Sequence, residues 1–337
     1  MRRIKLPFTA QLEIEFVDRD LALRRVEEWA EKGVVDVKVV FGPEGCGKTS
    51  WLRQSAELLK ELGFDVIYVD PIKRDFIAYT DLKEFVRKLV EAASEAIGVA
   101  QLKLATLAID FGSYALRIGK RKIAILVDDV FQAIGFDKAA IYVKGLLNLI
   151  EHPPRSYDRI VAIVATSEGV SRREIGRHRW AQLLAMWNMH ENAFKQLYDA
   201  LPEKTLSFGE TWRLTGGNPK LLAQLYEANW HVDNVLEMIS EEKMLRRFAA
   251  SLTQDEKTMM REALENPDAL LKKGKQGLEL LDKLVELNLV MDIPVRKEFL
   301  WLDTPPPEKD FELGIGKYVA WQTPLHREAV RKALEEQ

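Results

Sequence analysis

Short apolar runs alternate with helically spaced apolar positions over the first two-thirds of the chain. We predict strands at 34–41 (VVDVKVVF), 64–70 (FDVIYVD), 122–129 (KIAILVDD) and 159–166 (RIVAIVAT), with a candidate fifth strand at 180–187. Helices are expected between them at 49–62, 81–97 and 137–150. Strands that alternate with helices predict an α/β fold with a parallel sheet and right-handed crossovers. Residues 122–129 are almost continuously apolar, which indicates a strand covered on both faces.

The strand signal stops after residue 188, and helical spacing continues. Helices expected at 191–200, 207–214, 219–229 and 232–248 predict a helical lid. From residue 251 the order is helix, helix, LVMDI, the turn residues PVRK, EFLWLD and a last helix at 324–336. Pro294 breaks the run between two strand-like segments, so we expect a β-hairpin and hence a winged helix. The predicted domains are a core at 1–189, a lid at 190–249 and a winged-helix domain at 250–337.

Composition excludes several classes of protein. The chain has 49 Lys and Arg against 52 Asp and Glu, a net charge of −3, which excludes a uniformly basic nucleic-acid coat but not a local basic patch. Cys46 is the only cysteine and the five histidines are scattered, which argues against disulfides and against Cys or His metal clusters. Residues 92–118 are long and fairly apolar, but charged residues interrupt them; we expect a core helix pair, with a partner-binding surface as the alternative. We therefore expect a cytoplasmic protein that does not bind membranes.

One motif predicts a specific chemistry. Residues 42–49 (GPEGCGKT) match G-x-x-x-x-G-K-[ST], with a predicted strand before them and a predicted helix after them. Glycines let successive backbone N–H groups converge on one anion, and the following helix presents its positive end to the same phosphates. A chance glycine-rich turn is the alternative, and this context argues against it.

We predict that this phosphate loop binds a nucleotide together with the start of the next helix. The predicted binding residues are Gly42, Pro43, Glu44, Gly45, Cys46, Gly47, Lys48, Thr49 and Ser50. Lys48 is also a catalytic candidate, because its charge can act on the β- and γ-phosphates, and the Thr49 hydroxyl can ligate Mg²⁺. Cys46 is not needed for this chemistry and is interpreted as a small neutral filler.

Two adjacent acids end the strand at 122–129. Asp128 fits the Walker B role of holding Mg²⁺, and Asp129 is the candidate to orient or deprotonate the attacking water. The alternative is a polar strand end that faces solvent. Many ATPases with this layout have Glu at the second position; the shorter Asp129 predicts slow hydrolysis, which suits a switch better than a motor.

Two further groups are candidates for contacts to phosphate. Thr166 and Ser167 end the strand at 159–166, where a hydroxyl can bond the attacking water or the γ-phosphate; a simple strand cap is an equal alternative. Residues 171–179 contain the arginines Arg172, Arg173, Arg177 and Arg179. One of them, with Arg177 as the catalytic candidate, would be an arginine finger toward a neighbouring subunit. A solvated helix face or contacts to a phosphate backbone are the alternatives.

Two more segments resemble archaeal STAND-type ATPases, which are relatives of the AAA+ proteins. Residues 16–20 (FVDRD), followed by a helical segment at 21–29, resemble the F-V-x-R-x-x-E-L segment of that family, with Ala22 where Glu is common. Residues 215–219 (TGGNP) resemble its T-G-G-N-P box at the start of a lid helix. With the phosphate loop and the pair of aspartates, the resemblance covers about residues 14–230.

The resemblance implies a P-loop NTPase fold with ATP and Mg²⁺ as cofactors and an extra strand between the phosphate-loop strand and the Asp128 strand. It places Phe16, Val17 and Pro219 near the adenine and implies a winged-helix domain after the lid. Pro219 also fits the first turn of a helix, where its missing N–H costs nothing. Lys220 follows it and is a candidate phosphate sensor; a solvated lysine is the alternative.

A winged helix suggests DNA binding, but the charge of this one opposes it. Residues 249–337 contain 13 Lys and Arg against 17 Asp and Glu, and the recognition-helix candidate at 278–287 has a net charge of −2. Because phosphate affinity depends on positive contacts, we expect a packing or protein-partner module. Its leucines Leu278, Leu281, Leu284 and Leu287 and the tryptophans Trp301 and Trp321 are expected in the core. Arg296 and Lys297, or basic residues at 117–122 and 172–179, are the alternatives for contacts to DNA.

Three functions follow from these patterns. The favoured one is a Mg-ATP-binding, slowly hydrolysing molecular switch that relays its nucleotide state to the lid and the winged helix. It would bind ATP and ADP, form a homo-oligomer and act on a protein partner whose identity the sequence does not give. The second is a DNA-acting AAA+-like ATPase, such as a loader or a repair or transposition factor. The third is a nucleotide-binding scaffold without hydrolysis.

Overall fold

A computed structural model describes residues 2–167 and 174–336. The chain forms two compact units. The sheet unit contains Met1–Ile4, Asp18–Phe41 and Lys48–Ala185, and the helical unit contains Lys5–Val17, Gly42–Gly47 and Met186–Gln337. The phosphate loop up to Gly47 thus belongs by its contacts to the helical unit, whereas Lys48 and Thr49 belong to the sheet unit.

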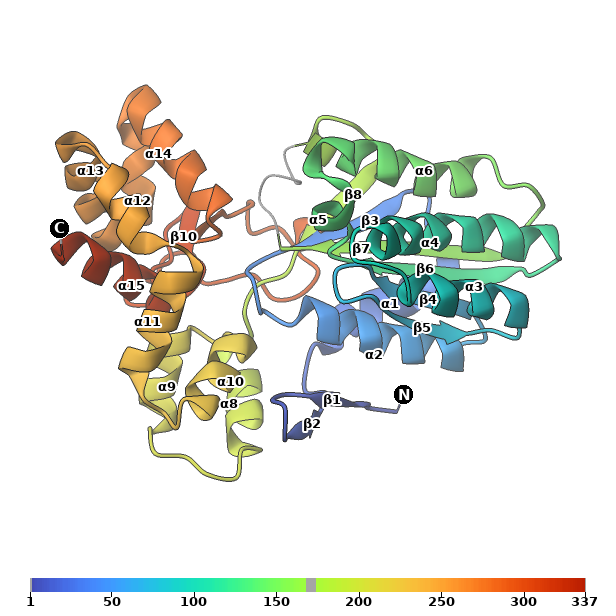
Figure 1. Ribbon diagram of the computed structural model, residues 1–337, viewed down its shortest axis with the longest axis horizontal. Helices are drawn as coiled ribbons and strands as arrows, with labels where there is room; N and C mark the ends of the chain where they lie inside the picture. The colour runs from blue at the N-terminus through green and yellow to red at the C-terminus, as the bar shows by residue number, and fades with distance from the viewer. Residues whose placement is uncertain (1, 168–173, 337) are drawn as a thin grey trace. The chain divides into compact units, whose positions relative to one another are not determined.

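The sheet unit is built on a six-stranded sheet with the order β5-β4-β6-β7-β3-β8 (Figure 1). Its strands are β3 (Val37–Phe41), β4 (Asp65–Asp70), β5 (Asp75–Tyr79), β6 (Lys122–Asp128), β7 (Arg159–Thr166) and β8 (Ala181–Ala185). All neighbours are parallel except β4 and β5. The five predicted strands and the mostly parallel sheet are confirmed. So is the extra strand that the resemblance implied, because β7 lies between β3 and β6.

The register brings the ends of the central strands to one edge of the sheet. Asp128 on β6 lies opposite Ala165 on β7, and Thr166 lies opposite Phe41, the last residue of β3. Because the strands are parallel, their carboxyl ends share this edge. The residues predicted to act on the nucleotide lie at the ends of β6 and β7 or directly after β3, β6 and β7.

Helices cover both faces of this sheet, as its apolar strands require. On one face, α1 (Asp20–Lys32) contacts α2 (Lys48–Glu61), and α2 packs on β4, β6 and β7. On the other face, α4 (Val99–Arg117) packs on β4 and β6 and contacts α3 (Lys83–Ala93) and α6 (Ala139–Glu151). Figure 1 shows these two groups on opposite sides of the strands. Residues Ile123 to Val127 of β6 are buried as a result.

Two details of the sheet unit differ from the prediction. The helix expected at 81–97 ends at Ala93, and Gly98, whose φ is 92°, precedes α4. The edge strand β5 was missed, because DFIAY follows the turn residues PIKR and shows no clean alternation. The remaining short helices are α5 (Val130–Ile134) and the 3₁₀ turn η1 (Phe136–Lys138). The helix α4 packs into the core through Leu104, Ala108 and Phe111, as expected.

The helical unit has one continuous apolar core, whose buried members extend from Met189 to Leu334. Its helices are α8 (Glu191–Asp199), α9 (Phe208–Thr215), α10 (Pro219–Glu227), α11 (Val232–Glu242), α12 (Leu245–Ser251), α13 (Gln254–Glu265), α14 (Gly274–Glu286) and α15 (Pro324–Glu335), with the 3₁₀ turn η2 (Pro267–Lys272). A short antiparallel pair, β1 (Lys5–Pro7) and β2 (Glu13–Glu15), also belongs to it. The single helix expected at 232–248 is two helices, because Met244 has a left-handed φ of 51° and a right-handed helix cannot pass through it.

The predicted β-hairpin around Pro294 is wrong. Strand β9 (Val290–Asp292) pairs with β10 (Val319–Trp321), and Glu298–Leu300 is a 3₁₀ turn, η3. Arg296 holds together the long loop between β9 and β10. Its guanidinium donates to the carbonyl oxygens of Pro306, Pro307, Gly316 and Lys317 at 2.8–3.1 Å. Arg296 is therefore a loop-closing residue and not the tip of a hairpin.

Most of the core predictions for this region hold, and Leu287 is partly buried against the same core. Trp301 and Trp321 are fully buried, as are Leu281 and Leu284. Leu278 is instead 48% exposed, because it lies on the outer face of α14. The winged-helix assignment and the three domain boundaries stay predictions. Within residues 2–167 and 174–336, no helix combines the length and the apolar character needed to cross a membrane.

Candidate functional site

Helix α2 begins directly at the predicted catalytic lysine. Lys48 is 95% buried at its first position, and Thr49 and the partly buried Ser50 follow. The helix is held by its apolar face, where Trp51 and Leu52 are fully buried. Before it, Gly45 and Gly47 have φ values of 75° and 103°, which non-glycine residues rarely adopt. Glycine at these two positions is thus favoured by the conformation of the loop.

The two predicted acids lie at the carboxyl end of β6. Asp128 is almost fully buried, and its carboxyl accepts hydrogen bonds from the Thr49 hydroxyl and from the Tyr68 hydroxyl, the latter at 3.1 Å. Asp129 comes next, with a left-handed φ of 43°. Asp128 Oδ1 and Asp129 Oδ1 are both buried and have no hydrogen-bond partner among the described residues. Buried carboxylate oxygens without donors are suited to a cation.

The electrostatics of this pair favour the same conclusion. Burial raises the pKa of Asp128, and the neighbouring charge of Asp129 adds to the rise. Burial also raises the pKa of Asp129, against the opposing charge of Lys48. Two like charges in a buried place are costly, so a bound cation would relieve both.

Mg²⁺ fits the residues present. It prefers oxygen ligands, keeps several waters and needs only one or two protein ligands beside substrate phosphates. The Thr49 hydroxyl and the Asp128 carboxylate, joined by a hydrogen bond, supply such a pair. In the described part of the chain there is no group of three or more His, Cys, Asp and Glu that could hold a metal ion alone. A cation here would therefore depend on the nucleotide for further ligands.

Two more predicted residues lie at the end of the neighbouring strand β7. Thr166 is buried at the end of β7, and the backbone N–H of the next residue, Ser167, donates to the Asp129 carboxylate. The Asp129 N–H in turn donates to the Ala165 carbonyl at 3.0 Å. The backbone of Ala165 and Ser167, on either side of Thr166, therefore fixes the position of Asp129.

Four residues near the pair were not found by sequence reasoning. Asp70 is fully buried at the end of β4 and accepts from the Lys73 backbone at 3.0 Å and from Lys73 Nζ at 2.8 Å. Burial opposes the charge of Lys73, but the bond to Asp70 and the nearby acids outweigh it and raise the pKa of Lys73. Arg53 hydrogen-bonds Tyr68, which in turn donates to Asp128. A signal existed for Asp70, because it ends an apolar strand just as Asp128 does.

The phosphate loop contacts the TGGNP box within the helical unit. Pro219 is the first residue of α10, and Asn218 caps that helix by accepting from the Leu221 N–H. The Lys220 N–H donates to the Gly45 carbonyl at 3.3 Å, and Lys220 Nζ pairs with the Glu44 carboxylate at 2.7 Å. Lys220 Nζ is thus paired with Glu44 rather than free in solvent, and its role as a phosphate sensor stays a prediction.

The remaining predicted residues lie on other segments of the chain. Phe16 is buried and Val17 packs against the core of the helical unit. Arg172 and Arg173 lie outside the described residues. Arg177 is exposed and pairs with Glu174 at 3.0 Å, and Arg179 is also exposed. Their predicted roles therefore stay predictions.

Comparison with known proteins assigns the family. A family model described as an ATPase domain predominantly from Archaea matches residues 16–225. The chain belongs to this ATPase-domain family. The matched segment includes the phosphate loop, the pair of aspartates and the TGGNP box. The archaeal ATPase family expected from the resemblance is therefore confirmed.

Other comparisons of the chain are distant. No curated protein matches it. Solved structures with a similar fold include an AMPPCP-bound DnaA from Aquifex aeolicus, at 18% identity, a TM-score of 0.38 and coverage of 79% of this chain and 77% of that one. The ORC2 protein of Aeropyrum pernix, in ADPNP and ADP complexes, matches at 14% identity and a TM-score of 0.40, over 97% and 98% of the two chains. A RuvB mutant of Thermotoga maritima matches at 13% identity and a TM-score of 0.36, over 83% and 91%.

Proposed function

We propose that the chain binds ATP with Mg²⁺ at the phosphate loop and hydrolyses it slowly, as a molecular switch. The observation that supports this best is the hydrogen bond between Thr49 and Asp128, beside a buried carboxylate oxygen without a partner. A hydroxyl at the start of the loop helix and an acid at the end of a neighbouring strand are the two protein ligands that P-loop NTPases use for Mg²⁺.

Each residue then has a definite task. Lys48 and the loop N–H groups bind the phosphates, and Thr49 with Asp128 would hold Mg²⁺, which supplies charge stabilisation to the phosphates when it is bound. Asp129 accepts a proton from the attacking water and is held for this by the Ser167 N–H. Thr166 would bond the water or the γ-phosphate. Arg177, or another arginine at 172–179, would reach a neighbouring subunit.

The switch character rests on Asp129 and on the lid. Aspartate is one methylene shorter than the glutamate common at this position, so it reaches a water less well and turnover would be slow. Phe16, Val17 and Pro219 would border the adenine. The core, lid and winged helix at 1–189, 190–249 and 250–337 would be the parts that the nucleotide state rearranges.

A DNA-acting ATPase is the second candidate, and the described basic residues support it less. Arg296 is used to close its own loop. In the basic stretch at 117–122, Lys120 pairs with Asp65 and Asp81, and Arg121 pairs with Asp158. Of the positions considered for DNA, Arg117, Lys122, residues 172–179 and Lys297 remain.

Steady-state ATP turnover, with and without duplex DNA at low and moderate salt, tests the proposal against this alternative. We expect slow, Mg²⁺-dependent turnover that DNA does not change, and no nucleotide binding by Lys48→Ala. Stimulation by DNA that fades with salt would favour the DNA-acting ATPase, because such contacts release counterions. A wild-type chain that binds no ATP would refute the proposal.

A further inference from the structure

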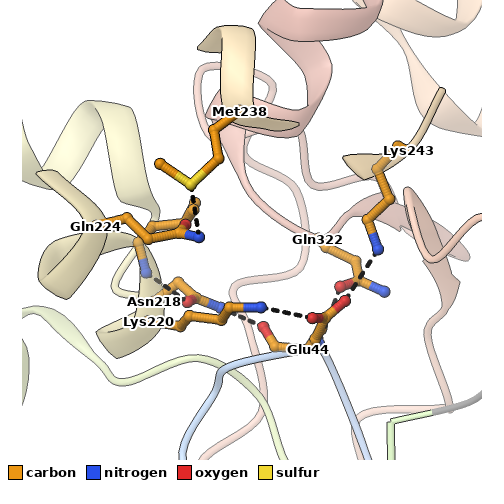
Figure 2. Close-up of polar contacts among 8 residues, drawn as sticks. Glu44, Asn218, Lys220, Gln224, Met238, Lys243 and Gln322 are labelled. Atoms are coloured by element: carbon orange, nitrogen blue, oxygen red, sulfur yellow. Dashed lines mark hydrogen bonds and ion pairs between the residues drawn. The ribbon is translucent and has the colours of Figure 1, made fainter. Parts of the chain in front are cut away.

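Four polar residues of the helical unit, one of them in the phosphate loop, are joined by a closed ring of hydrogen bonds. The Glu44 N–H donates to Gln322 Oε1 at 2.9 Å, and Asn188 Nδ2 donates to the Gln322 carbonyl at 2.8 Å. Asn218 Nδ2 donates to Asn188 Oδ1 and to the Glu44 carbonyl, both at 2.9 Å. Figure 2 shows Asn218 and Gln322 on either side of Glu44. We call Glu44, Asn188, Asn218 and Gln322 the amide ring.

The amide ring is buried and joins segments far apart in the sequence. Asn188, Asn218 and Gln322 are exposed by no more than 4%. They come from the segment after β8, from the cap of α10 and from the residues between β10 and α15. Buried polar groups of this kind are costly to leave unpaired, so the ring forms or opens as a whole.

The side chain of Glu44 makes a second connection to the same unit. Its carboxylate lies between Lys220 Nζ at 2.7 Å and Lys243 Nζ at 2.9 Å (Figure 2). Burial alone would raise the pKa of Glu44, but the two lysines outweigh it and lower the pKa to about 2. On the next residue, Gly45, an added Cβ would lie 2.3 Å from Lys220 Cβ. The phosphate loop is therefore held both by its backbone and by its side chain.

Gln322 links the amide ring to the C-terminal helix, α15. The next residue, Thr323, caps α15 by accepting from the His326 N–H at 3.2 Å. Gln322 and Lys243 both lie beyond residues 16–225, the segment that the family model matches. The loop that would bind phosphate thus depends on a part of the chain that the matched domain does not contain.

We propose that Gln322 is a positioning residue of the nucleotide site: through the amide ring it sets the conformation of the Glu44 peptide and couples the phosphate loop to α15. This rests on the proposed nucleotide binding. A nucleotide that favours one conformation of the loop then stabilises the start of α15, and an intact ring tightens nucleotide binding by the same factor, because the coupling is reciprocal.

The single cysteine of the chain provides a direct probe. Cys46 is fully buried within the same loop, so a thiol reagent such as DTNB can reach it only when the loop opens. Gln322→Met keeps the length of the side chain and removes the acceptor for the Glu44 N–H. Gln224→Met is the matched control, because Gln224 lies outside the amide ring and its amide contacts Met238 Sδ at 3.5 Å.

We expect Cys46 of nucleotide-free Gln322→Met to react about tenfold faster than in the wild type, and mant-ADP to bind about tenfold more weakly, which corresponds to about 1.4 kcal/mol. Gln224→Met should match the wild type in both. Hydrogen exchange supplies a readout that a merely structural role would not move. Nucleotide should slow exchange in α15 of the wild type and of Gln224→Met, but not of Gln322→Met.

Wild-type Cys46 reactivity and affinity in Gln322→Met would overturn the proposal. So would equal changes in Gln224→Met, or an α15 that does not respond to nucleotide in the wild type. If Gln322→Met does not fold, Asn188→Ser opens the ring at the bond to the Gln322 carbonyl and should show the same changes. A wild type that binds no nucleotide would instead refute the proposed function, whereas the nucleotide-free Cys46 rates would still test the ring.

Discussion

Asp128 accepts hydrogen bonds from Thr49 and Tyr68 and keeps one buried oxygen without a described partner. Tyr68 is itself held by Arg53. Groups that hold a metal ligand in this way commonly change metal affinity 10- to 100-fold when they are removed. The orientation of the proposed Mg²⁺ ligand therefore depends on a tyrosine from the neighbouring strand, β4.

Tyr68→Phe should raise the Mg²⁺ concentration that supports half-maximal ATP turnover by about tenfold. The substitution removes only the hydroxyl that donates to Asp128. Tyr142→Phe is the matched control, because Tyr142 is buried in the same unit and donates to the Ala105 carbonyl at 2.9 Å. An unchanged Mg²⁺ dependence in Tyr68→Phe would contradict this role.

Among the helices and strands, those whose formation depends on local sequence patterns were the predictable ones. The strand β7 was predicted at its observed bounds, Arg159–Thr166, because a short apolar run of this length is typical of a buried strand. The pairing of β9 with β10 was not predicted. Arg296 closes the loop between them by donating to backbone carbonyl oxygens, and because every residue has such an oxygen, the sequence does not indicate which ones it contacts. The break at Met244 was missed for a similar reason, since methionine carries no signal for a left-handed conformation.

The start of α15 predicts a dependence of stability on pH. His326 is buried there, with its Nδ1 2.8 Å from Thr323 Oγ1. Burial lowers the pKa of His326 to about 3, and Lys243 adds to the fall. The unfolded state, with a pKa near 6.5, then binds a proton that the folded state does not. His326 therefore costs no stability above pH 6.5, and its burial lowers the free energy of unfolding increasingly as the pH falls toward 3.

We expect the free energy of unfolding to fall by about 2 kcal/mol more in the wild type than in His326→Gln between pH 6.5 and 5. Urea unfolding at the two pH values measures this difference. His231→Gln is the control, because His231 is exposed and its removal should leave the pH dependence unchanged. Equal pH dependence in the wild type and His326→Gln would show that His326 is not held neutral by the fold.

At the scale of the molecule, the helical unit combines the predicted lid and the predicted winged-helix domain in one core. Helix α15 contacts α9, α11 and α12, which lie wholly or mostly in the predicted lid. Buried leucines on both sides of residue 249, among them Leu225 and Leu325, belong to the same cluster. The helices on both sides of this predicted boundary should therefore unfold together.

Leu325→Ala should destabilise α11 as much as α15, by about 2–5 kcal/mol, because a buried leucine leaves a cavity in the shared core. Hydrogen exchange measured element by element tests this. Leu104→Ala in α4 is the control and should act on the sheet unit, to whose core Leu104 belongs. Faster exchange confined to residues 250–336 in Leu325→Ala would indicate an independent C-terminal domain.

The residues of the candidate site that belong to local sequence motifs were predictable. Lys48, Thr49 and Asp128 follow from a motif and from a strand that ends in acids, and the structure brings Thr49 and Asp128 together. Gln322 was not predictable, because it acts on Glu44 across 278 positions of sequence through one backbone bond. A polar side chain that hydrogen-bonds the backbone of a residue distant in the sequence is not marked by any local sequence pattern.

The most direct test of the account is nucleotide binding and ATP turnover measured on the same preparation of Asp129→Asn. Asparagine tolerates the left-handed conformation of this position and keeps its size, so the fold and the phosphate loop should be intact. We predict mant-ATP affinity equal to that of the wild type and turnover reduced at least about 100-fold, because the proton acceptor is lost. Full turnover in Asp129→Asn would contradict the proposed mechanism.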